Sequence, residues 1–190
     1  DNTATGNSIS DGGGIYCNDS SPTITDCTIS DNTATNWGGG ISCLTSSSPT
    51  IAGCTITGNT ASNDGGGISC WSGSNPTITD CTISDNIAGG CGGGIKCTGS
   101  TPTLANTVVC GNSPDQYCGN NYTDNGGNTI EEECDSDGDG VPDGEDAFPD
   151  DPNEWADSDG DGVGDNGDAF PNDPNEWADS DSDGVGDNSD

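Results

Sequence analysis

The chain has 190 residues, a formal net charge of −33 and a single basic residue, Lys96. Nucleic acid and anionic membrane surfaces are excluded as partners, because binding to phosphates needs several lysines or arginines that displace counterions. No apolar stretch approaches the ~20 residues that cross a bilayer, so we expect no membrane insertion.

Residues 1–111 form an array of repeats with a period of about 26 to 30 residues. The tetrapeptide GGGI recurs at Gly12, Gly38, Gly65 and Gly92, and each copy leads into a segment such as SPTITDCTISDN. Glycine, proline and asparagine interrupt the β-branched runs too often for helices, and apolar residues alternate as in strands buried on one side. The array therefore predicts an all-β solenoid with one coil per repeat.

The alternation predicts which way each side chain of a coil points. The side chains expected to point inward in the first coil are Ile15, Cys17, Ile24, Cys27 and Ile29. Those expected to face water are Thr25, Thr28 and Ser30. Stacking also brings like residues together, and one asparagine per coil falls at the same corner, at Asn2, Asn32, Asn59, Asn86 and Asn112. We expect these amides to hydrogen-bond along the solenoid axis and to satisfy buried backbone groups.

The array resembles the right-handed parallel β-helices of the pectin-lyase-like superfamily, in particular the GGGI-containing repeats of polymorphic outer-membrane proteins. The resemblance covers residues 1–134 and implies that fold, but it implies little about activity. The segment from Val109 to Cys134 breaks the period, and we expect it to cap the last coil from about residue 109. The first coil has no comparable cap, so either preceding coils have been cut away or that end docks against something. An open end suits docking on another copy, and we expect a homo-oligomer or fibre with end-to-end contacts.

Eleven cysteines predict disulfides and an oxidising compartment, so we expect a secreted or cell-surface protein. The first hypothesis is one disulfide within each coil, joining the pairs Cys17–Cys27, Cys43–Cys54 and Cys70–Cys81. The alternative is that inward cysteines remain unpaired thiols stacked in ladders. Cys110 and Cys134 can clamp the cap. Because eleven is an odd number, at least one thiol has no partner within the chain.

Catalysis is a weaker hypothesis, although many β-helices of the superfamily that the array resembles cleave acidic polysaccharides. Lyases of that kind need a lysine or arginine as base, and only Lys96 is available. Hydrolases use clustered aspartates, but Gly53 separates Asp26 from Asp80, and Asn106 follows them. We therefore expect no enzymatic activity.

Binding through an exposed face of the solenoid is another alternative. Thr-x-Thr segments are expected to form outward rows on one flat face, as in ice-binding solenoids, with Thr23, Thr25, Thr28, Thr55, Thr57, Thr77, Thr79 and Thr82. Threonine is also simply the best polar residue for an exposed strand. The sequons at Asn18 and Asn121, with the many serines and threonines, predict a glycoprotein, and glycans remain candidate partners.

Three copies of one acidic loop close the chain: DSDGDGVPDGED from Asp135, DSDGDGVGDNGD from Asp157 and DSDSDGVGDNSD from Asp179. Each loop has aspartate at positions 1, 3, 5, 9 and 12 and glycine at position 6, which is the ligand order of a twelve-residue calcium loop. A solvated acidic tail is the alternative. Random acidity, however, does not repeat a fixed glycine and five aspartates three times, so we predict at least three Ca²⁺ ions.

The predicted ligands are the five aspartates of each loop and the backbone carbonyl at position 7. For the first ion they are Asp135, Asp137, Asp139, Val141, Asp143 and Asp146. For the second they are Asp157, Asp159, Asp161, Val163, Asp165 and Asp168. For the third they are Asp179, Asp181, Asp183, Val185, Asp187 and Asp190.

The flanks AFPDDPNEWA and AFPNDPNEWA carry prolines and lack helical spacing, which argues against EF-hands. Residues 135–190 instead resemble thrombospondin type 3 repeats, with DxDxDGxxDxxD, a proline-containing spacer and the next DxD. The resemblance implies irregular chain wrapped around calcium with almost no apolar core. It also implies room for a second ion per repeat at spacer acids such as Glu154 and Glu176. Phe148 and Phe170 replace a cysteine of animal members, and we expect them to pack with Trp155 and Trp177.

The sequence thus predicts a right-handed parallel β-helix over residues 1–134 and three thrombospondin type 3-like calcium-binding repeats over residues 135–190. The expected function is that of a non-enzymatic extracellular structural protein, a calcium-stabilised surface, matrix or filament component that self-assembles end to end. The alternatives are an adhesin that binds glycan or ice through the solenoid face, and a polysaccharide-degrading β-helix enzyme.

Overall fold

The computed structural model describes residues 3–4, 12–119 and 121–189. Within these residues the chain is all-β, with nineteen strands and no helix. It divides into a first unit, Asp1–Glu132, and a second unit, Glu133–Asp190. Every described strand lies in the first unit, whereas the second is built from turns and bends.

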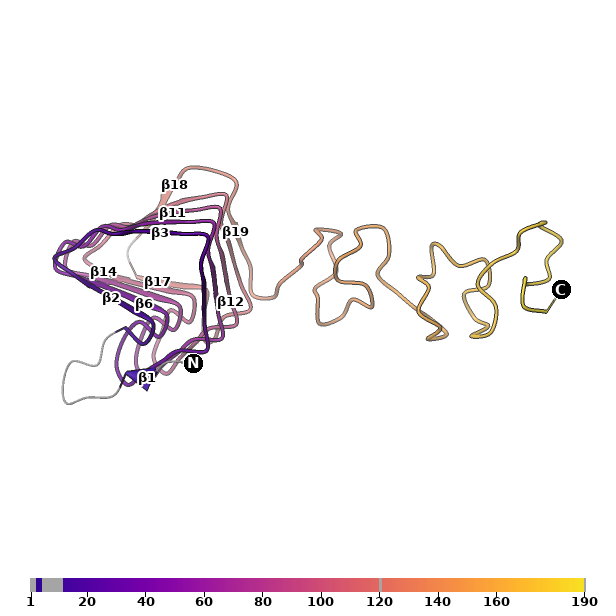
Figure 1. Cartoon of the computed structure of the whole chain (residues 1–190), viewed down its shortest axis with the longest axis horizontal. Coiled ribbons are helices and arrows are strands. Elements are labelled where there is room, and N and C mark those ends of the chain that lie inside the picture. Colours follow the sequence, from indigo (N-terminus) through magenta and orange to yellow (C-terminus); the bar gives the residue numbers. More distant parts are fainter. Residues whose placement is uncertain (1–2, 5–11, 120, 190) are drawn as a thin grey trace. The chain divides into compact units, whose positions relative to one another are not determined.

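The first unit is a parallel β-solenoid in which successive coils add one strand each to three five-stranded sheets, and a fourth sheet has four strands (Figure 1). Sheet 1 consists of β2 (Ile15–Asn18), β6 (Ile41–Leu44), β10 (Ile68–Trp71), β14 (Ile95–Thr98) and β17 (Tyr117–Gly119). Sheet 2 consists of β3 (Thr23–Thr25), β7 (Thr50–Ala52), β11 (Thr77–Thr79), β15 (Thr103–Ala105) and β18 (Thr123–Asp124). Sheet 3 consists of β4 (Thr28–Ser30), β8 (Thr55–Thr57), β12 (Thr82–Ser84), β16 (Val108–Cys110) and β19 (Thr129–Ile130). Sheet 4 consists of β1 (Thr3–Ala4), β5 (Thr33–Ala34), β9 (Thr60–Ala61) and β13 (Ile87–Ala88).

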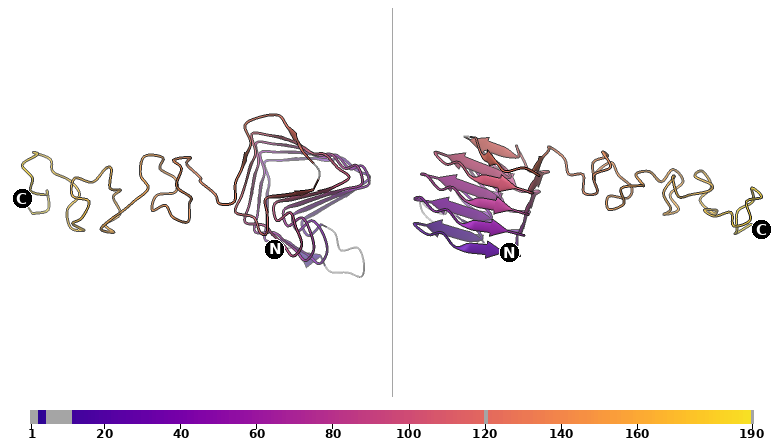
Figure 2. Two further views of the ribbon diagram at one scale, coloured as in Figure 1. Left: turned by 180° about the vertical axis from the view of Figure 1, so that it is seen from behind. Right: turned by 90° about the horizontal axis from the view of Figure 1, so that it is seen from above.

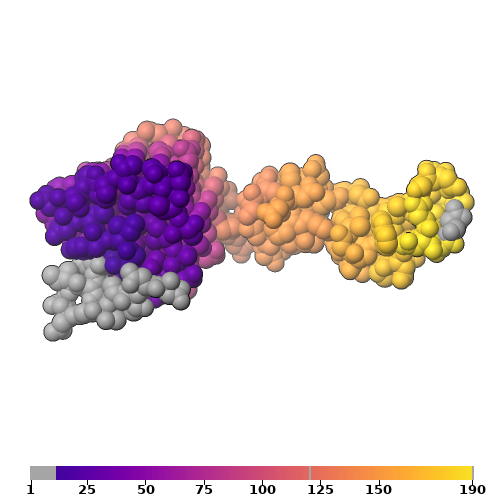
Figure 3. Space-filling view, viewed as in Figure 1, coloured from indigo at the N-terminus to yellow at the C-terminus, as the bar shows by residue number. Residues whose placement is uncertain are grey.

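The strands of each sheet stack in register (Figure 2), so columns of aliphatic side chains fill the core of the solenoid. Figure 3 shows one outer face of this unit. The columns are Ile41–Ile68–Ile95 in sheet 1, Ile51–Ile78–Leu104 in sheet 2 and Ile56–Ile83–Val109 in sheet 3. All nine side chains are fully buried. The predicted inward direction of Cys17, Ile24 and Ile29 is confirmed, and Thr25 and Thr28 are exposed as predicted.

Cys27 is exposed, although its Sγ lies 3.0 Å from the carbonyl oxygen of Thr25, the same contact that Cys54 and Cys81 make two residues back along the chain. Its equivalents Cys54 and Cys81 are buried, and their Sγ atoms lie 3.6 Å and 3.7 Å from the carbonyl oxygens of Ile24 and Ile51 in the preceding coil. A sulfur at this corner is therefore covered by the coil before it. Of the coil before that of Cys27, the structure describes β1 alone.

The predicted asparagine ladder is confirmed for the described asparagines, whereas Asn2 lies outside the described residues. The Nδ2 of Asn32 donates to Oδ1 of Asn59 at 2.9 Å, and Asn59 donates in the same way to Asn86, also at 2.9 Å. Asn86 continues to Asn112, whose Nδ2 donates to Oε1 of Gln116 at 2.7 Å. Gln116 thus ends the ladder. The repeat of 26 to 30 residues did not predict this residue, because Gln116 lies only four positions after Asn112.

A second ladder, of serines, was not predicted from the sequence. The backbone N–H of Ser20 donates to Oγ of Ser47, Ser47 donates to Ser74, and Ser74 donates to Ser100, each at 3.1 Å. Ser47, Ser74 and Ser100 are buried. These residues occupy the turns between sheets 1 and 2, so two corners of the solenoid are held by side-chain to backbone hydrogen bonds.

The GGG triplets are needed for two different reasons. The first glycine of each triplet has a positive φ, for example 67° at Gly38. The second has no such φ, but a Cβ at Gly39 would overlap the backbone of Gly66 and Thr60 in the next coil. Glycine therefore allows both the bend and the close approach of neighbouring coils.

The segment predicted to cap the last coil forms a shorter coil of its own. Its strands β17, β18 and β19 extend sheets 1, 2 and 3 in register with the coil before. Tyr117 and Tyr122 pack against the core, with their ring centroids 5.3 Å apart. Two tyrosine rings therefore cover aliphatic columns at this end.

The disulfides predicted within coils are wrong, and the alternative of stacked free thiols is confirmed. The free cysteines are Cys17, Cys27, Cys43, Cys54, Cys70, Cys81 and Cys97. The register pairs Cys17 with Cys43, Cys43 with Cys70 and Cys70 with Cys97 along sheet 1. Each cysteine therefore meets its own equivalent in the next coil. Burial raises the pKa of the Cys81 thiol, which favours the protonated, unreactive form.

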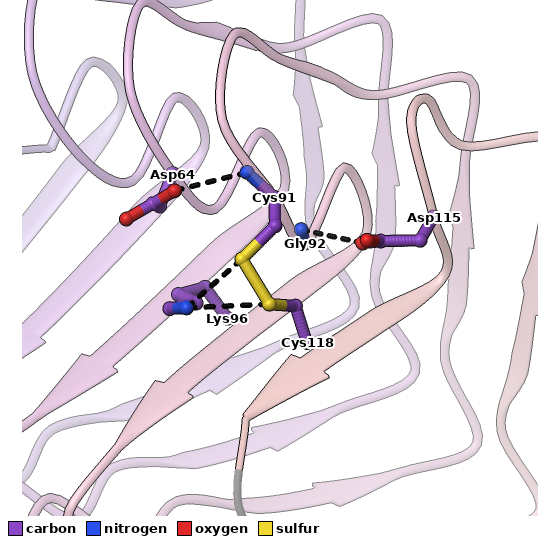
Figure 4. Close-up of a disulfide and its surroundings, with 6 residues drawn as sticks. All are labelled: Asp64, Cys91, Gly92, Lys96, Asp115 and Cys118. Carbon is purple, nitrogen blue, oxygen red and sulfur yellow. Dashed lines mark hydrogen bonds between the residues drawn. A yellow bond between two sulfur atoms is a disulfide. The ribbon is translucent and has the colours of Figure 1, made fainter.

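A disulfide joins Cys91, in the turn before β14, to Cys118 in β17 (Figure 4). Lys96 lies beside it, with Nζ 2.9 Å from Sγ of Cys91 and 3.2 Å from Sγ of Cys118. The backbone N–H of Cys91 donates to Oδ1 of Asp64 at 2.9 Å. Cys110 and Cys134 are also disulfide-bonded.

Alkylation of the denatured protein is expected to distinguish stacked thiols from disulfides within coils. Without reductant, seven cysteines should react with iodoacetamide, and prior reduction should add the four disulfide-bonded ones. Intact-mass spectrometry counts the adducts. A single adduct before reduction would contradict the thiol ladders, because disulfides within the coils would leave the other cysteines blocked.

Candidate metal centres

The first three aspartates of each acidic loop converge. Their carboxylate oxygens lie within 4.8 Å of one another in three clusters: Asp135, Asp137 and Asp139; Asp157, Asp159 and Asp161; and Asp179, Asp181 and Asp183. Hard carboxylate oxygens at this separation are the donors that Ca²⁺ prefers. Among the described residues these are the clusters of metal-ligating side chains.

The loop bends because the aspartate at position 1 binds its own backbone. Asp135 accepts from the N–H of Gly138 at 2.8 Å through Oδ1 and from that of Gly140 at 3.1 Å through Oδ2. Both glycines have positive φ, 80° and 98°. Asp157 makes the same two bonds in the second loop. In the third loop Ser182 takes position 4 with a φ of 63°, a left-handed conformation that serine adopts less readily than glycine.

Several carboxylate oxygens inside these loops are buried without a hydrogen-bond partner. They are the Oδ2 atoms of Asp137, Asp139, Asp146, Asp159 and Asp161. An unpartnered buried charge is costly unless a cation is close to it. The charge of Asp146, the predicted ligand at position 12, contributes to the raised pKa of Asp137 at position 3. Asp168, the equivalent of Asp146, is also buried, and Asp190 lies outside the described residues.

The aspartates at position 9 are arranged differently. Asp143 accepts from the backbone N–H and from the hydroxyl of Ser136, both at 2.7 Å. Asp165 and Asp187 bind Ser158 and Ser180 in the same way. These hydrogen bonds lower the pKa of Asp165 and Asp187. The aspartate at position 9 therefore closes the loop by binding the serine at position 2.

The valines at position 7 follow the turn at position 5. The N–H of Val141 donates to Oδ1 of Asp139 at 2.7 Å, and those of Val163 and Val185 donate to Asp161 and Asp183.

Desolvation, together with the charge of the neighbouring aspartate, raises the pKa of Asp137 and Asp159. The carboxylates of each loop thus repel one another at neutral pH, and a divalent cation removes that repulsion.

The predicted packing of phenylalanine on tryptophan is wrong. Within the described part of the chain, no ring contact joins Phe148 or Phe170 to a tryptophan. Trp155 and Trp177 remain 46% and 47% exposed. The backbone closes each spacer instead, because the N–H groups of Ala147 and Ala169 donate to the carbonyls of Trp155 and Trp177 at 3.2 Å. The second unit therefore has no apolar core among the residues that the structure describes.

The aligned aspartates of the solenoid have a backbone role. Asp26, Gly53, Asp80 and Asn106 occupy the same corner, with φ of 52°, 61°, 53° and 48°. Aspartate, asparagine and glycine are the residues that tolerate this left-handed conformation best. The shared conformation accounts for the residue types at this corner.

The single flat threonine face is wrong. Thr23, Thr25, Thr77 and Thr79 lie in sheet 2, whereas Thr28, Thr55, Thr57 and Thr82 lie in sheet 3. The corner at Asp26 and Asp80 separates the two sheets. One unbroken column does run along sheet 2, through Thr23, Thr50, Thr77, Thr103 and Thr123.

The fold defines this chain as an all-β protein built on a parallel solenoid. It belongs to the family described as the right handed beta helix region, whose model matches residues 1–135. No curated protein and no solved structure matches the chain. Within the described ranges, no helix is long and apolar enough to cross a membrane.

Proposed function

We propose that this chain is a non-enzymatic extracellular structural protein, a calcium-stabilised component of a surface, matrix or filament. The observation that carries the proposal is the repeated acidic loop with buried, unpartnered carboxylate oxygens, such as those of Asp137 and Asp159. A bound cation supplies the partner that these oxygens lack. The likeness of residues 135–190 to thrombospondin type 3 repeats supports the same interpretation.

In this proposal Ca²⁺ is held in each loop by the aspartates at positions 1, 3, 5 and 12 and by the carbonyl at position 7. Calcium supplies charge neutralisation and no chemistry beyond it. At a calcium concentration 100 times the dissociation constant, each site stabilises the folded unit by about 2.7 kcal/mol. The second unit depends on this contribution, because it has no core of its own among the described residues.

Catalysis is not part of the proposal. The single lysine, Lys96, is held beside the Cys91–Cys118 disulfide, where it is poorly placed to act as a lyase base. Asp26 and Asp80 occupy a corner that selects residues for their backbone conformation. A second candidate function, adhesion to glycan or to ice, is favoured by the threonine column of sheet 2, which begins at Thr23.

Self-assembly end to end completes the proposal. The in-register repeats support it, because a second copy of the same array would continue the stack of parallel strands. The contact predicted for the coil of Asp1 lies outside the described residues.

Negative-stain electron microscopy of the full chain tests the proposal. We expect filaments in millimolar calcium and dispersed particles after addition of a chelator. Dispersed monomers in millimolar calcium would exclude self-assembly. Filaments that a chelator leaves intact would exclude calcium from the junction. Release of sugar products from acidic polysaccharides would overturn the non-enzymatic assignment.

A further inference from the structure

The spacer between two acidic loops docks onto the loop that follows it. Oε2 of Glu154 accepts from the backbone N–H of Asn166 at 3.0 Å, and Nδ2 of Asn166 donates to the carbonyl of Asn153 at 2.6 Å. The next spacer repeats both contacts, with Glu176 accepting from Asn188 at 3.0 Å and Nδ2 of Asn188 donating to the carbonyl of Asn175. Two spacers thus carry the same two-point contact, which we call the latch.

Glycine at position 8 of the loop makes room for the latch. Gly164 and Gly186 are buried, and a Cβ on either would overlap the carboxylate of Glu154 or Glu176. Neither glycine has a positive φ, so space is the reason for glycine here.

The first acidic loop is an internal control. No PNEW segment precedes it, and position 8 is Pro142. A Cβ added at its Gly144, which is position 10, would meet no atom within 4 Å. The first loop, which has no spacer glutamate at position 8, therefore carries a side chain there, that of Pro142, where the other two loops have glycine.

The other end of each spacer is bonded to the loop before it. Oδ1 of Asp146 accepts from the N–H of Phe148 at 2.7 Å, while Oδ2 of the same carboxylate is the buried, unpartnered oxygen of the first loop. Asp168 accepts from Phe170 in the same way, at 2.7 Å. One spacer thus connects a predicted ligand of one loop to the backbone of the next.

We propose that Glu154 and Glu176 are positioning residues that tie each calcium loop to its predecessor, rather than ligands of a second ion. The inference rests on the proposed calcium binding. Each glutamate acts as a hydrogen-bond acceptor that fixes the turn at positions 8 to 10 of the following loop. The second and third loops are therefore preformed for calcium only when the spacer before them is ordered, and the first loop is independent of any latch.

Calorimetric titration of the full chain with CaCl₂ tests this role. Relative to the unchanged protein, Glu154→Ala with Glu176→Ala should bind the same number of ions, with about tenfold weaker affinity at two of them, equivalent to about 1.4 kcal/mol each. Gly164→Ala should weaken one site, because its methyl group displaces Glu154. Glu145→Ala is the matched control, since it removes an exposed carboxylate of the first loop that is not in the latch, and it should change affinity less than twofold.

Glutamine substitution separates a positioning role from ligation. Glu154→Gln keeps an acceptor oxygen for Asn166 and removes the charge, so affinity should stay close to that of the unchanged protein. Loss of one ion per glutamate replaced would show that these side chains are ligands and overturn the inference. Unchanged affinity in the double alanine variant would overturn the positioning role of the glutamates but not the proposed calcium binding. No heat with calcium in the unchanged protein would overturn the proposed function, and the latch with it.

Discussion

Removal of calcium is expected to unfold the second unit and to leave the solenoid intact. Residues 135–190 contain 21 acidic residues and no basic one, and Trp155 and Trp177 are nearly half exposed. Without a cation, repulsion within each loop opposes the folded form, and no buried apolar surface offsets it. The first unit has its own isoleucine core and does not depend on the ion.

Limited digestion with chymotrypsin measures this effect. In calcium, the bonds after Trp155 and Trp177, each of which is followed by alanine, should resist cleavage. In chelator they should be cut at least ten times faster, because a protease attacks the unfolded form, while a solenoid fragment persists. Magnesium at the same concentration is the control, since it demands a tighter octahedral site and should protect less. A cleavage rate that is the same with calcium and with chelator would contradict metal dependence.

Replacement of the ladder asparagine Asn59 by alanine is expected to destabilise the solenoid by roughly 3 to 5 kcal/mol, because several buried polar groups would lose their partners. Nδ2 of Asn59 donates to the carbonyl of Ile29 at 2.8 Å and to Oδ1 of Asn86 at 2.9 Å. Its Oδ1 accepts from both the backbone and the side chain of Asn32. No water can replace these bonds, because the side chain is fully buried.

Urea unfolding followed by far-ultraviolet circular dichroism measures the loss, since every described strand lies in the first unit. Calcium is kept constant throughout. Asn63→Ala is the matched control, because Asn63 also bonds an asparagine of the neighbouring coil, Asn36, but at an exposed position. It should cost no more than about 0.5 kcal/mol. Equal losses in the two variants would contradict the role assigned to the buried ladder.

The solenoid was predictable because its signals repeat. The GGGI tetrapeptide and the TIT segments return once per coil. A strand assignment that is uncertain in one repeat is therefore fixed by its equivalents in the other repeats, and stacking follows from the period alone. The ladder through Asn32, Asn59 and Asn86 follows from the same argument. Gln116 does not, because it joins the ladder from a segment where the period is broken.

The cysteine pairing was not predictable from spacing. Cys43 and Cys54 are close in sequence, which favoured a bond within the coil. In a stacked array, however, the nearest residue to Cys43 along the sheet is its own equivalent in the next coil, Cys70.

The prediction that the threonines form one flat face was wrong for a related reason. The turn at Asp26 divides TIT from TIS, and a two-residue corner has no clear mark in an alternating pattern.

For the acidic loops, spacing indicated which residues gather, and it left open what each of them does. The carboxylates at positions 1, 3 and 5 converge, as expected when a DxDxD segment wraps around one ion site. The bond from Ser136 to Asp143 depends on a serine at position 2, which a ligand pattern ignores. The latch depends on Glu154 and Gly164, ten residues apart, and neither belongs to the ligand pattern.

The asparagine ladder also bears on how the length of this protein can change. Asn32 meets Asn59, and Asn59 meets Asn86, through the same bonds at the same separation of 27 residues. If one copy were lost by recombination, the two flanking copies would meet through surfaces that already fit each other. Duplication would insert a further copy with equal ease. The number of coils can therefore change by drift, or under selection for a longer solenoid, without any new type of contact between coils.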